Sequence, residues 1–476
     1  MQDKTERVCA KVLEKVTPTG KDRAKIEAIA RKLEADVVSA CKQLGVKAEV
    51  RVEGSIAKDT WLSEEPDVDV FMCVSPKIPR ASLGEVCLKV ARRATRGSRQ
   101  LERFAEHPYL EAFVGGTRVN IVPCYASKRG EWLSATDRTP YHTDYMRKHL
   151  DERLRCEVRL LKQFMKGIGV YGAEIKVGGF SGYLCELLVL QWGSFVGVLK
   201  TFAGQRHRIV VDIEGYYRDR ENELGLLFNE PLVIVDPVDK ARNVASAVQA
   251  EKLYAFVAAA QTFLKNPSMI FFCPSRTEPT PVKELKQELK TRGSAIVFVA
   301  FGKVGAVPDV LWGQLYKSQR SLHKLVQLND FKILRDIAWS DEKSLNMFIF
   351  ELEHYCIPPV KMHLGPPLEK EQECEKFLAK HQDGSGTVAG PYVEGGRWVV
   401  QVRRKYTNAC VLLSEKLKDG GRNAGVADKL AQVLRKDFKV LVNEQVAEVH
   451  GKNSEFAKFL TEFLSGKPKW LETTQT

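Results

Sequence analysis

The 476-residue chain is predicted to be a multidomain α+β protein. By its length it should form about three or four domains. Strand-like alternation is frequent in its first part, helical spacing dominates the middle, and mixed strands and helices follow. We expect four parts: an α/β head (1–149), a helical neck (150–266), an α+β body (267–368), and a tail with the C-terminal part of the body (369–476).

The expected elements follow the spacing of apolar residues. In the head these are helices over 22–44 and 81–94, strands over 46–52 and 67–74, and a hairpin over 109–124. In the neck they are helices over 157–165, 182–196 and 239–264. Further on we expect strand 294–301, helix 312–325, strands 331–339 and 346–353, Pro-rich breaks at 357–359 and 365–367, helix 370–380, a basic-aromatic strand over 397–406, and helices over 424–438 and 454–463.

The charge balance favours a polyanionic partner. Lys and Arg number 73 against 60 Asp and Glu, a net charge of +13, and cationic surfaces gain affinity by releasing counterions from phosphates. The 11 Cys include no C-x-x-C pair, which fits reduced thiols better than a disulfide framework or a zinc site. The most apolar run, 180–199, is broken by Glu186 and Gln191, so we expect a buried helix and a cytoplasmic protein without a membrane partner.

Two aspartates in the second expected strand carry the strongest chemical signal. Asp67 and Asp69 are two apart, so both carboxylates emerge on one face of a strand. They repel each other unless a cation lies between them, and Mg²⁺ or Mn²⁺ prefers such ligands together with substrate phosphates. Upstream, a turn at Gly54 and Ser55 leads into a short helix expected over 57–62 and offers donors to a phosphate. Together these features predict phosphoryl or nucleotidyl transfer, although an isolated D-x-D is usually a solvated strand edge.

A third carboxylate is expected beside this pair, because two-metal nucleotidyl transfer uses one to hold the ion that activates the attacking hydroxyl. The best position for it, on the hairpin, holds Asn120 instead of Asp. An amide oxygen ligates Mg²⁺ weakly, carries no charge and cannot act as a general base.

The chain resembles the archaeal (class I) CCA-adding enzymes, tRNA nucleotidyltransferases of the DNA polymerase β superfamily. The likeness runs nearly end to end and rests on ordered motifs: GSIAKDTWL (from Gly54), PDVDVF (Pro66), AEHPY (Ala105), VPCY (Val122), DRTPYH (Asp137), EVRLLKQFMK (Glu157), YGAE (Tyr171), GGFSGYLCELL (Gly178) and VDPVDKARNVA (Val235). It implies a polymerase β-like head and a neck that completes the nucleotide pocket. It also implies template-independent addition of C, C and A to immature tRNA from CTP and ATP, with two Mg²⁺ or Mn²⁺ ions.

The resemblance also implies roles for individual residues. The metal-binding and catalytic positions fall on Asp67, Asp69 and Asn120. The nucleotide-binding positions fall on Gly54, Ser55, Lys58, His107, Thr139, His142, Lys162, Tyr171 and Arg242. Taken singly, most of these would be surface cations or structural residues.

The C-terminal half is expected to hold the acceptor stem and TΨC arm of tRNA. Proteins recognise A-form RNA by its shape, phosphates and 2′-hydroxyls. Candidate contacts are Arg397, Arg403, Arg404, Lys405, Lys418 and Arg422, for which solvated surface charge is the alternative. The resemblance also implies a possible homodimer.

Two other functions stay open. A poly(A) polymerase or related terminal nucleotidyltransferase shares the Gly-Ser and D-x-D features. A catalytically silent tRNA- or nucleotide-binding relative is compatible with Asn120. Our hypothesis for this chain is that it binds nucleotide and tRNA but transfers slowly or not at all, because one anionic ligand is missing.

Overall fold

The computed structural model describes residues 2–104, 106–205 and 207–472. Contacts divide the chain into two compact units, Met1–Arg276 with Lys467–Thr476, and Thr277–Gly466. The C-terminal segment belongs to the first unit, where Trp470 stacks on Phe271 with 5.6 Å between the ring centroids. The finer division into four parts stays a prediction.

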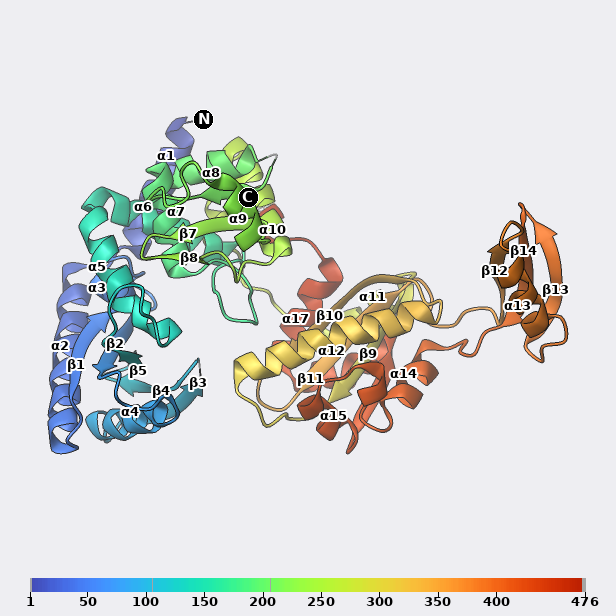
Figure 1. Cartoon of the computed structure of the whole chain (residues 1–476). Helices are drawn as coiled ribbons and strands as arrows, with labels where there is room; N and C mark the ends of the chain where they lie inside the picture. Colours follow the sequence, from blue (N-terminus) through green and yellow to red (C-terminus); the bar gives the residue numbers. More distant parts are fainter. Residues whose placement is uncertain (1, 105, 206, 473–476) are drawn as a thin grey trace. The chain divides into compact units, whose positions relative to one another are not determined.

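A five-stranded sheet forms the head (blue in Figure 1), with the strand order β1-β2-β5-β4-β3. The strands are β1 (Ala48–Glu53), β2 (Asp67–Val74), β3 (Arg99–Phe104), β4 (Pro108–Val114) and β5 (Thr117–Tyr125). β2 and β5 run parallel, whereas the other neighbours are antiparallel. The expected strands and hairpin are therefore present, and β3 is an additional strand.

Helices α2 (Gly20–Gln43) and α4 (Arg80–Ala94) cover one face of this sheet. Val68 and Val70 of β2 pack in the same core cluster as Leu33 and Val37 of α2. Since strand side chains alternate between faces, Asp67 and Asp69 are left on the opposite face. The short helix α3 (Gly54–Ala57) begins directly after β1, so our expectation of a helix over 57–62 was wrong. The positive φ of Gly54, 74°, turns the chain at that point.

The neck is mainly helical, as expected, and its core is rich in aromatic residues. The remaining elements of the first unit are α1 (Gln2–Val16), α5 (Thr139–His149), α6 (Glu152–Gly167), α7 (Gly182–Trp192), α8 (Phe195–Ala203), α9 (Glu221–Leu227), α10 (Ala250–Lys265), β6 (Ile209–Val211), β7 (Leu232–Asp236) and β8 (Asp239–Asn243). Phe164 of α6 packs edge-on against Phe195 and Phe263 at 5.4 Å between ring centroids. Such edge-to-face pairs add to the stability gained by burial.

The segment expected as a helix over 239–264 is a hairpin followed by a shorter helix. β7 and β8 pair antiparallel, and α10 begins only at Ala250. The side chain of Asn243 holds the hairpin, because it accepts from the backbone N–H of Ile234 at 2.9 Å and donates to the carbonyl of Leu232 at 3.0 Å. Our expectation that Arg242 lies in a helix was therefore wrong, because this side-chain bridge outweighs the local apolar spacing.

The apolar run at 180–199 forms two helices instead of one. α7 and α8 meet at a bend of 89°. Among the described residues no single helix is long and apolar enough to cross a membrane, and these two reach that length and composition only when joined. Leu187, Leu188 and Leu199 from the two helices are buried in the neck core.

The second unit is built on a four-stranded sheet of order β10-β11-β9-β15. Its elements are β9 (Ala295–Phe301), β10 (Ile333–Ser340), β11 (Asn346–Leu352), β15 (Phe438–Val442), α11 (Val282–Thr291), α12 (Pro308–Leu328), α14 (Ala409–Leu417), α15 (Asp428–Leu434), α16 (Ala447–Lys452) and α17 (Ser454–Ser465). Val297 and Val299 of β9 face one core cluster, whereas Ile296 and Phe298 face the other. Both faces of the sheet are therefore covered, which explains the continuous apolar run of β9.

A smaller sheet of order β12-β14-β13 lies in the same unit with helix α13 (Glu371–His381). Its strands are β12 (Val360–Pro367), β13 (Thr387–Glu394) and β14 (Arg397–Arg403). The expected break at 365–367 falls in the last part of β12, an edge strand where proline is tolerated, and the pairing with β14 shifts register there, between Leu364 and Pro367. The expected helix over 424–438 is also shorter, because only Asp428–Leu434 is α-helical and Phe438 already opens β15.

Candidate active site

Asp67 and Asp69 lie beside two residues of β5 in register. Asp67 is the partner of Arg118, and Asp69 is the partner of Asn120. Asn120 donates from Nδ2 to Oδ1 of Asp69 at 2.9 Å, and Arg118 donates from Nε and Nη2 to the two carboxylate oxygens of Asp67. The two carboxylates share one face, as the sequence predicted.

Gly54 leaves room for one of these carboxylates. A Cβ atom at this position would lie 2.3 Å from Oδ2 of Asp69, and the backbone has a φ of +74°. Burial raises the pKa of Asp69 to about 6. A carboxylate held in such a place is stabilised in its charged form by a nearby cation.

The donor set fits a divalent cation but is short of one anionic ligand. Two carboxylates and an amide oxygen are hard oxygen ligands of the kind that Mg²⁺ and Mn²⁺ use. Within residues 2–104, 106–205 and 207–472, no group of three or more His, Cys, Asp or Glu side chains is placed to hold a metal. Asn120 is therefore the site's main departure from a three-carboxylate arrangement.

A cavity of about 120 Å³ beside the carboxylates joins several predicted residues. Its lining includes Ser55, Asp67, Lys162 and Tyr171, together with Arg118. The turn after β1, strand β2 and the neck helix α6 thus contribute side chains to one cavity. This proximity is what a site for a phosphorylated substrate beside a carboxylate pair requires.

Lys58 and Lys162 share the carboxylate of Glu186, a buried residue of α7. The Nζ of Lys58 lies 2.6 Å from Oε2 of Glu186, and the Nζ of Lys162 lies 3.1 Å from Oε1. Thr60 also donates to Oε1 at 2.6 Å, and its hydroxyl accepts from Lys162 at 2.9 Å. Burial alone would raise the pKa of Glu186, but the two lysines and these hydrogen bonds lower it to about 2. Glu186 therefore stays ionised and holds both ammonium groups in place.

Asp236, at the end of β7, gathers a second set of side chains. Its carboxylate lies 2.8 Å from Nε2 of His142 and 2.7 Å from Nη1 of Arg242, and it accepts from the hydroxyl of Tyr183 at 3.2 Å. The rings of His142 and Tyr183 stack at 4.1 Å. Burial opposes ionisation of Asp236, but the hydrogen bond and charge of His142 and the charge of Arg242 bring its pKa to about 2. Burial lowers the pKa of His142.

Lys58 connects these two groups. Its ammonium lies over the ring of Tyr183, 5.5 Å from the centroid. Tyr183 follows directly on Gly182, the first residue of α7, and Glu186 lies one turn further along the same helix. One neck helix therefore positions the head lysine through both a carboxylate and an aromatic ring.

Two predicted residues have weaker connections to this arrangement. His107 is buried just before β4, and its Nε2 has no hydrogen-bond partner among the described residues. Thr139 is the first residue of α5, one turn before His142. The structure brings neither side chain into the hydrogen-bonded groups of Glu186 or Asp236.

Sequence reasoning missed Glu186, Asp236, Thr60, Tyr183 and Arg118. Glu186 had a usable signal, because a charge in the middle of an apolar run must be paired when that run is buried. Asp236 and Tyr183 had none that spacing could reveal, since they meet each other across 53 residues of chain and Asp236 meets His142 across 94.

The predicted RNA-contacting residues lie in the second unit and differ in whether their side chains already bond within the chain. Arg404 donates to the carbonyls of Pro358 and Val360 at 2.8 and 2.7 Å and pairs with Asp330 at 3.2 Å. Arg397 donates to the carbonyl of Gly365 at 3.1 Å. The guanidinium groups of these two arginines are therefore bonded within the protein. The side chains of Arg403, Lys405 and Lys418 are exposed, and so is that of Arg422, which pairs with Asp428 at 3.2 Å.

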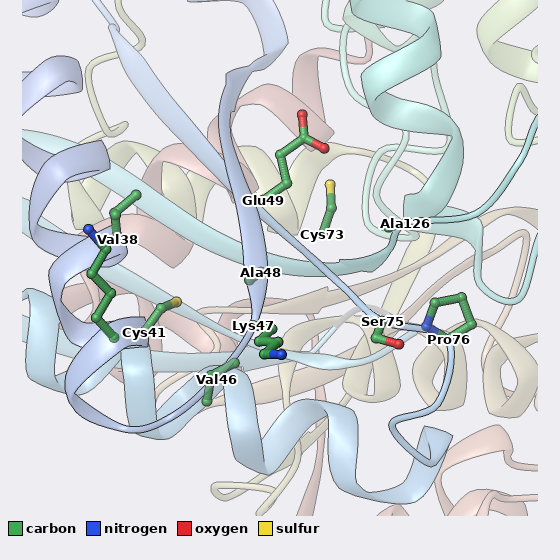
Figure 2. A pocket seen from close by; sticks show the side chains of 11 residues that line it. Val38, Cys41, Val46, Lys47, Ala48, Glu49, Cys73, Ser75, Pro76 and Ala126 are labelled. Atoms are coloured by element: carbon green, nitrogen blue, oxygen red, sulfur yellow. The ribbon is translucent and has the colours of Figure 1, made fainter.

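A larger hollow of about 690 Å³ lies at the other end of β1 and β2 (Figure 2). Ala48 pairs with Val74 there, whereas Asp69 pairs with Glu53 at the end nearer the carboxylates. Figure 2 shows Glu49 and Cys73 on one side of the hollow and Val38 of α2 on another. None of the predicted site residues lines it.

Comparison with known proteins agrees with this geometry. Residues 35–145 match the nucleotidyltransferase domain family, residues 156–273 the second domain of tRNA nucleotidyltransferases, and residues 292–443 the C-terminal domain of CCA-adding enzymes. A solved structure of a cytoplasmic RNA terminal U-transferase aligns with 57% of this chain and 98% of its own, at 16% identity and a TM-score of 0.45. The three family matches define the chain as a nucleotidyltransferase.

Full-length relatives specify the family. The chain is 35% identical to the CCA-adding enzyme of Methanosarcina barkeri over 456 residues, covering 95% of this chain and 97% of the relative. It is 34% identical to that of Haloarcula marismortui over 461 residues, covering 94% and 96%. The chain belongs to the archaeal CCA-adding enzymes, a family of tRNA nucleotidyltransferases, and the resemblance seen in the sequence is confirmed.

Proposed function

We propose that this chain adds C, C and A, without a template, to the 3′ end of tRNA that lacks them, using CTP and ATP. The observation that carries the proposal is the common cavity of Asp67, Ser55 and Lys162, with Asp69 beside Asp67 on β2. Membership of the CCA-adding family supports the choice of tRNA, CTP and ATP.

We assign the binding of Mg²⁺ or Mn²⁺ to Asp67 and Asp69, with Asn120 as a weak neutral ligand. When bound, such ions lower the pKa of an attacking hydroxyl and stabilise the leaving pyrophosphate. The family's two-ion arrangement needs a third anionic ligand, so Asn120 should make transfer slow while nucleotide binding persists. The residue change supports this, because an amide cannot replace the charge of a carboxylate.

We assign the triphosphate to the side of the cavity where Ser55, Lys58 and Lys162 lie. The two lysines are held by Glu186 at 2.6 and 3.1 Å, so they are oriented before a substrate arrives. Charge-assisted hydrogen bonds to phosphate oxygens are among the stronger polar contacts in proteins. Tyr171 lines the same cavity and would pack on the ribose or the base.

Base selection is assigned to the group around Asp236. Arg242 and His142 both bond to this carboxylate, which fixes the directions in which their other ring and guanidinium nitrogens point. Groups fixed in this way discriminate bases by hydrogen bonding at low entropic cost. Gly54 makes room for Asp69 in the proposed nucleotide site, and His107 and Thr139 are assigned to it on the family resemblance alone.

For tRNA we assign the acceptor stem and TΨC arm to the second unit. Its exposed cations Arg403, Lys405 and Lys418 are the better candidates, because Arg397 and Arg404 are engaged by their own chain and Arg422 pairs with Asp428 at 3.2 Å. Phosphate contacts of this kind weaken as salt concentration rises. A homodimer and a cytoplasmic location stay predictions.

The test is a nucleotide-addition assay on tRNA that ends at the nucleotide before CCA. With CTP and ATP, addition of three residues followed by a stop is expected, and replacement of both Asp67 and Asp69 by Asn should abolish it. A long A tail would instead indicate a poly(A) or terminal nucleotidyltransferase. No addition by this chain or by its Asn120→Asp variant would indicate a silent tRNA-binding relative.

A further inference from the structure

Both residues of β5 that lie opposite the aspartates donate hydrogen bonds to them. In a parallel pair, residues in register stand on the same face of strands about 4.8 Å apart. The guanidinium of Arg118 donates to both carboxylate oxygens of Asp67, and Asn120 donates to Asp69 at 2.9 Å. The sheet itself therefore supplies a partner for each carboxylate, and these partners do not depend on a bound ion.

The partner of Asp67 is a permanent positive charge. A guanidinium remains protonated at any working pH and matches a carboxylate in two parallel hydrogen bonds. Glu111 is the partner of Asn120 on β4, so acidic residues lie on the strands at both sides of β5.

The charge count follows from these contacts. Two carboxylates, one guanidinium and one neutral amide leave a single net negative charge between β2 and β5, and Glu111 is already paired with Arg103 at 2.9 Å. A second divalent ion placed there would be repelled by the positive charge of Arg118. It would also lack the anionic ligand that a carboxylate at position 120 would supply. Arg118 also lines the cavity of Ser55 and Lys162, so its charge lies where a phosphorylated substrate would bind.

We propose that Arg118 is a resident cation of the carboxylate site, and that this chain holds one divalent ion with its nucleotide where a two-ion site would hold two. The proposal rests on the proposed function, since it concerns the same site. The single ion would be held by Asp69, by Asp67 and by triphosphate oxygens, with Arg118 occupying the side of Asp67 that faces β5.

The experiment counts ions without using catalysis. Mn²⁺ bound to the full-length chain is measured by equilibrium dialysis and electron paramagnetic resonance, with a non-hydrolysable CTP analogue and no tRNA. One Mn²⁺ per wild-type chain is expected, and two for the double variant R118Q/N120D. Two ions bound to the wild-type chain, or one bound to the double variant, would overturn the proposal.

Single variants separate the effect of the charge of Arg118 on ion binding from the effect of its side-chain shape. R118Q should bind Mn²⁺ roughly tenfold more tightly, because it removes a cation that repels the ion and competes for both oxygens of Asp67. R118K keeps the charge and should still bind one ion. The matched control is R92Q, which removes an exposed arginine of α4 that pairs with Glu102 at 2.7 Å, and it should leave the count and the affinity unchanged. An unchanged affinity in R118Q would contradict the proposal, provided that circular dichroism shows the variant folded.

Failure of the proposed function would give a different result from failure of the role proposed for Arg118. A chain that binds one Mn²⁺ with the analogue but adds nothing to tRNA, even as N120D, would disprove the activity and leave the resident cation in place. A chain that adds CCA with two bound ions would disprove only the role of Arg118.

Discussion

Lys58 of the head and Glu186 of the neck form a buried ion pair, with 2.6 Å between Nζ and Oε2. Lys162 reaches the other oxygen of the same carboxylate at 3.1 Å. A buried carboxylate that serves two ammonium groups cannot be removed without leaving charge in the protein interior. Glu186 therefore contributes both to the stability of the contact between head and neck and to the positions of Lys58 and Lys162 in the site.

Replacing Glu186 with Gln should destabilise the protein by about 3–5 kcal/mol, because it leaves two buried lysines without their counter-charge. Urea unfolding followed by circular dichroism measures the change. The control is Glu65→Gln, which removes an exposed partner of Lys166 at 2.7 Å and should cost less than about 1 kcal/mol. Equal losses in the two variants would mean that Glu186 contributes no more than a surface pair.

Replacing Asn120 with Asp should raise the rate of CMP incorporation into tRNA at least about tenfold, because it restores an anionic metal ligand beside Asp69. Incorporation of labelled CMP by the two proteins under identical conditions gives the ratio. Asn229→Asp makes the same chemical change on the surface and should have no effect. If the wild-type chain and the Asn120→Asp variant transfer at equal rates, the hypothesis of slow transfer is wrong.

The sequence predicted those parts of the fold and site that depend on local alternation. The period of two placed Asp67 and Asp69 on one face, and the hairpin placed Asn120 beside them. Arg118 was missed although it lies two residues from Asn120, because only the register of β5 against β2 shows that it meets Asp67. The charge of Glu186 inside an apolar run indicated that it must be paired, but not that its partners are Lys58 and Lys162. Asp236 meets His142, which lies 94 residues away in the chain, and spacing has no signature for such a contact. Arg242 was assigned to a helix from the apolar spacing around it. The hairpin that it belongs to instead depends on the side-chain bridge of Asn243, which spacing does not predict.

In the second unit, Asp341 should make stability depend on pH. Burial would raise its pKa, but hydrogen bonds from the backbone N–H groups of Leu345, Ser344 and Lys343 lower it to about 2. Because the folded pKa lies below the ordinary value of 3.8, its contribution is complete above about pH 5 and is lost as pH falls toward 2. Melting temperatures of the wild-type chain and of Asp341→Asn should differ most at pH 7 and converge near pH 2. A constant difference across this range would contradict the assignment.

Replacing Gly54 with Ala should reduce CMP incorporation at least about a hundredfold, because the new Cβ would lie 2.3 Å from Oδ2 of Asp69 and displace that ligand. Gly45 provides a matched control, since it also has a positive φ, of 66°, but a Cβ there would meet nothing within 4 Å. Both variants should lose about 1–2 kcal/mol of stability from the backbone conformation alone. Only Gly54→Ala should lose transfer and Mn²⁺ affinity together. Comparable activity in the two variants would show that the space beside Asp69 is not what Gly54 provides.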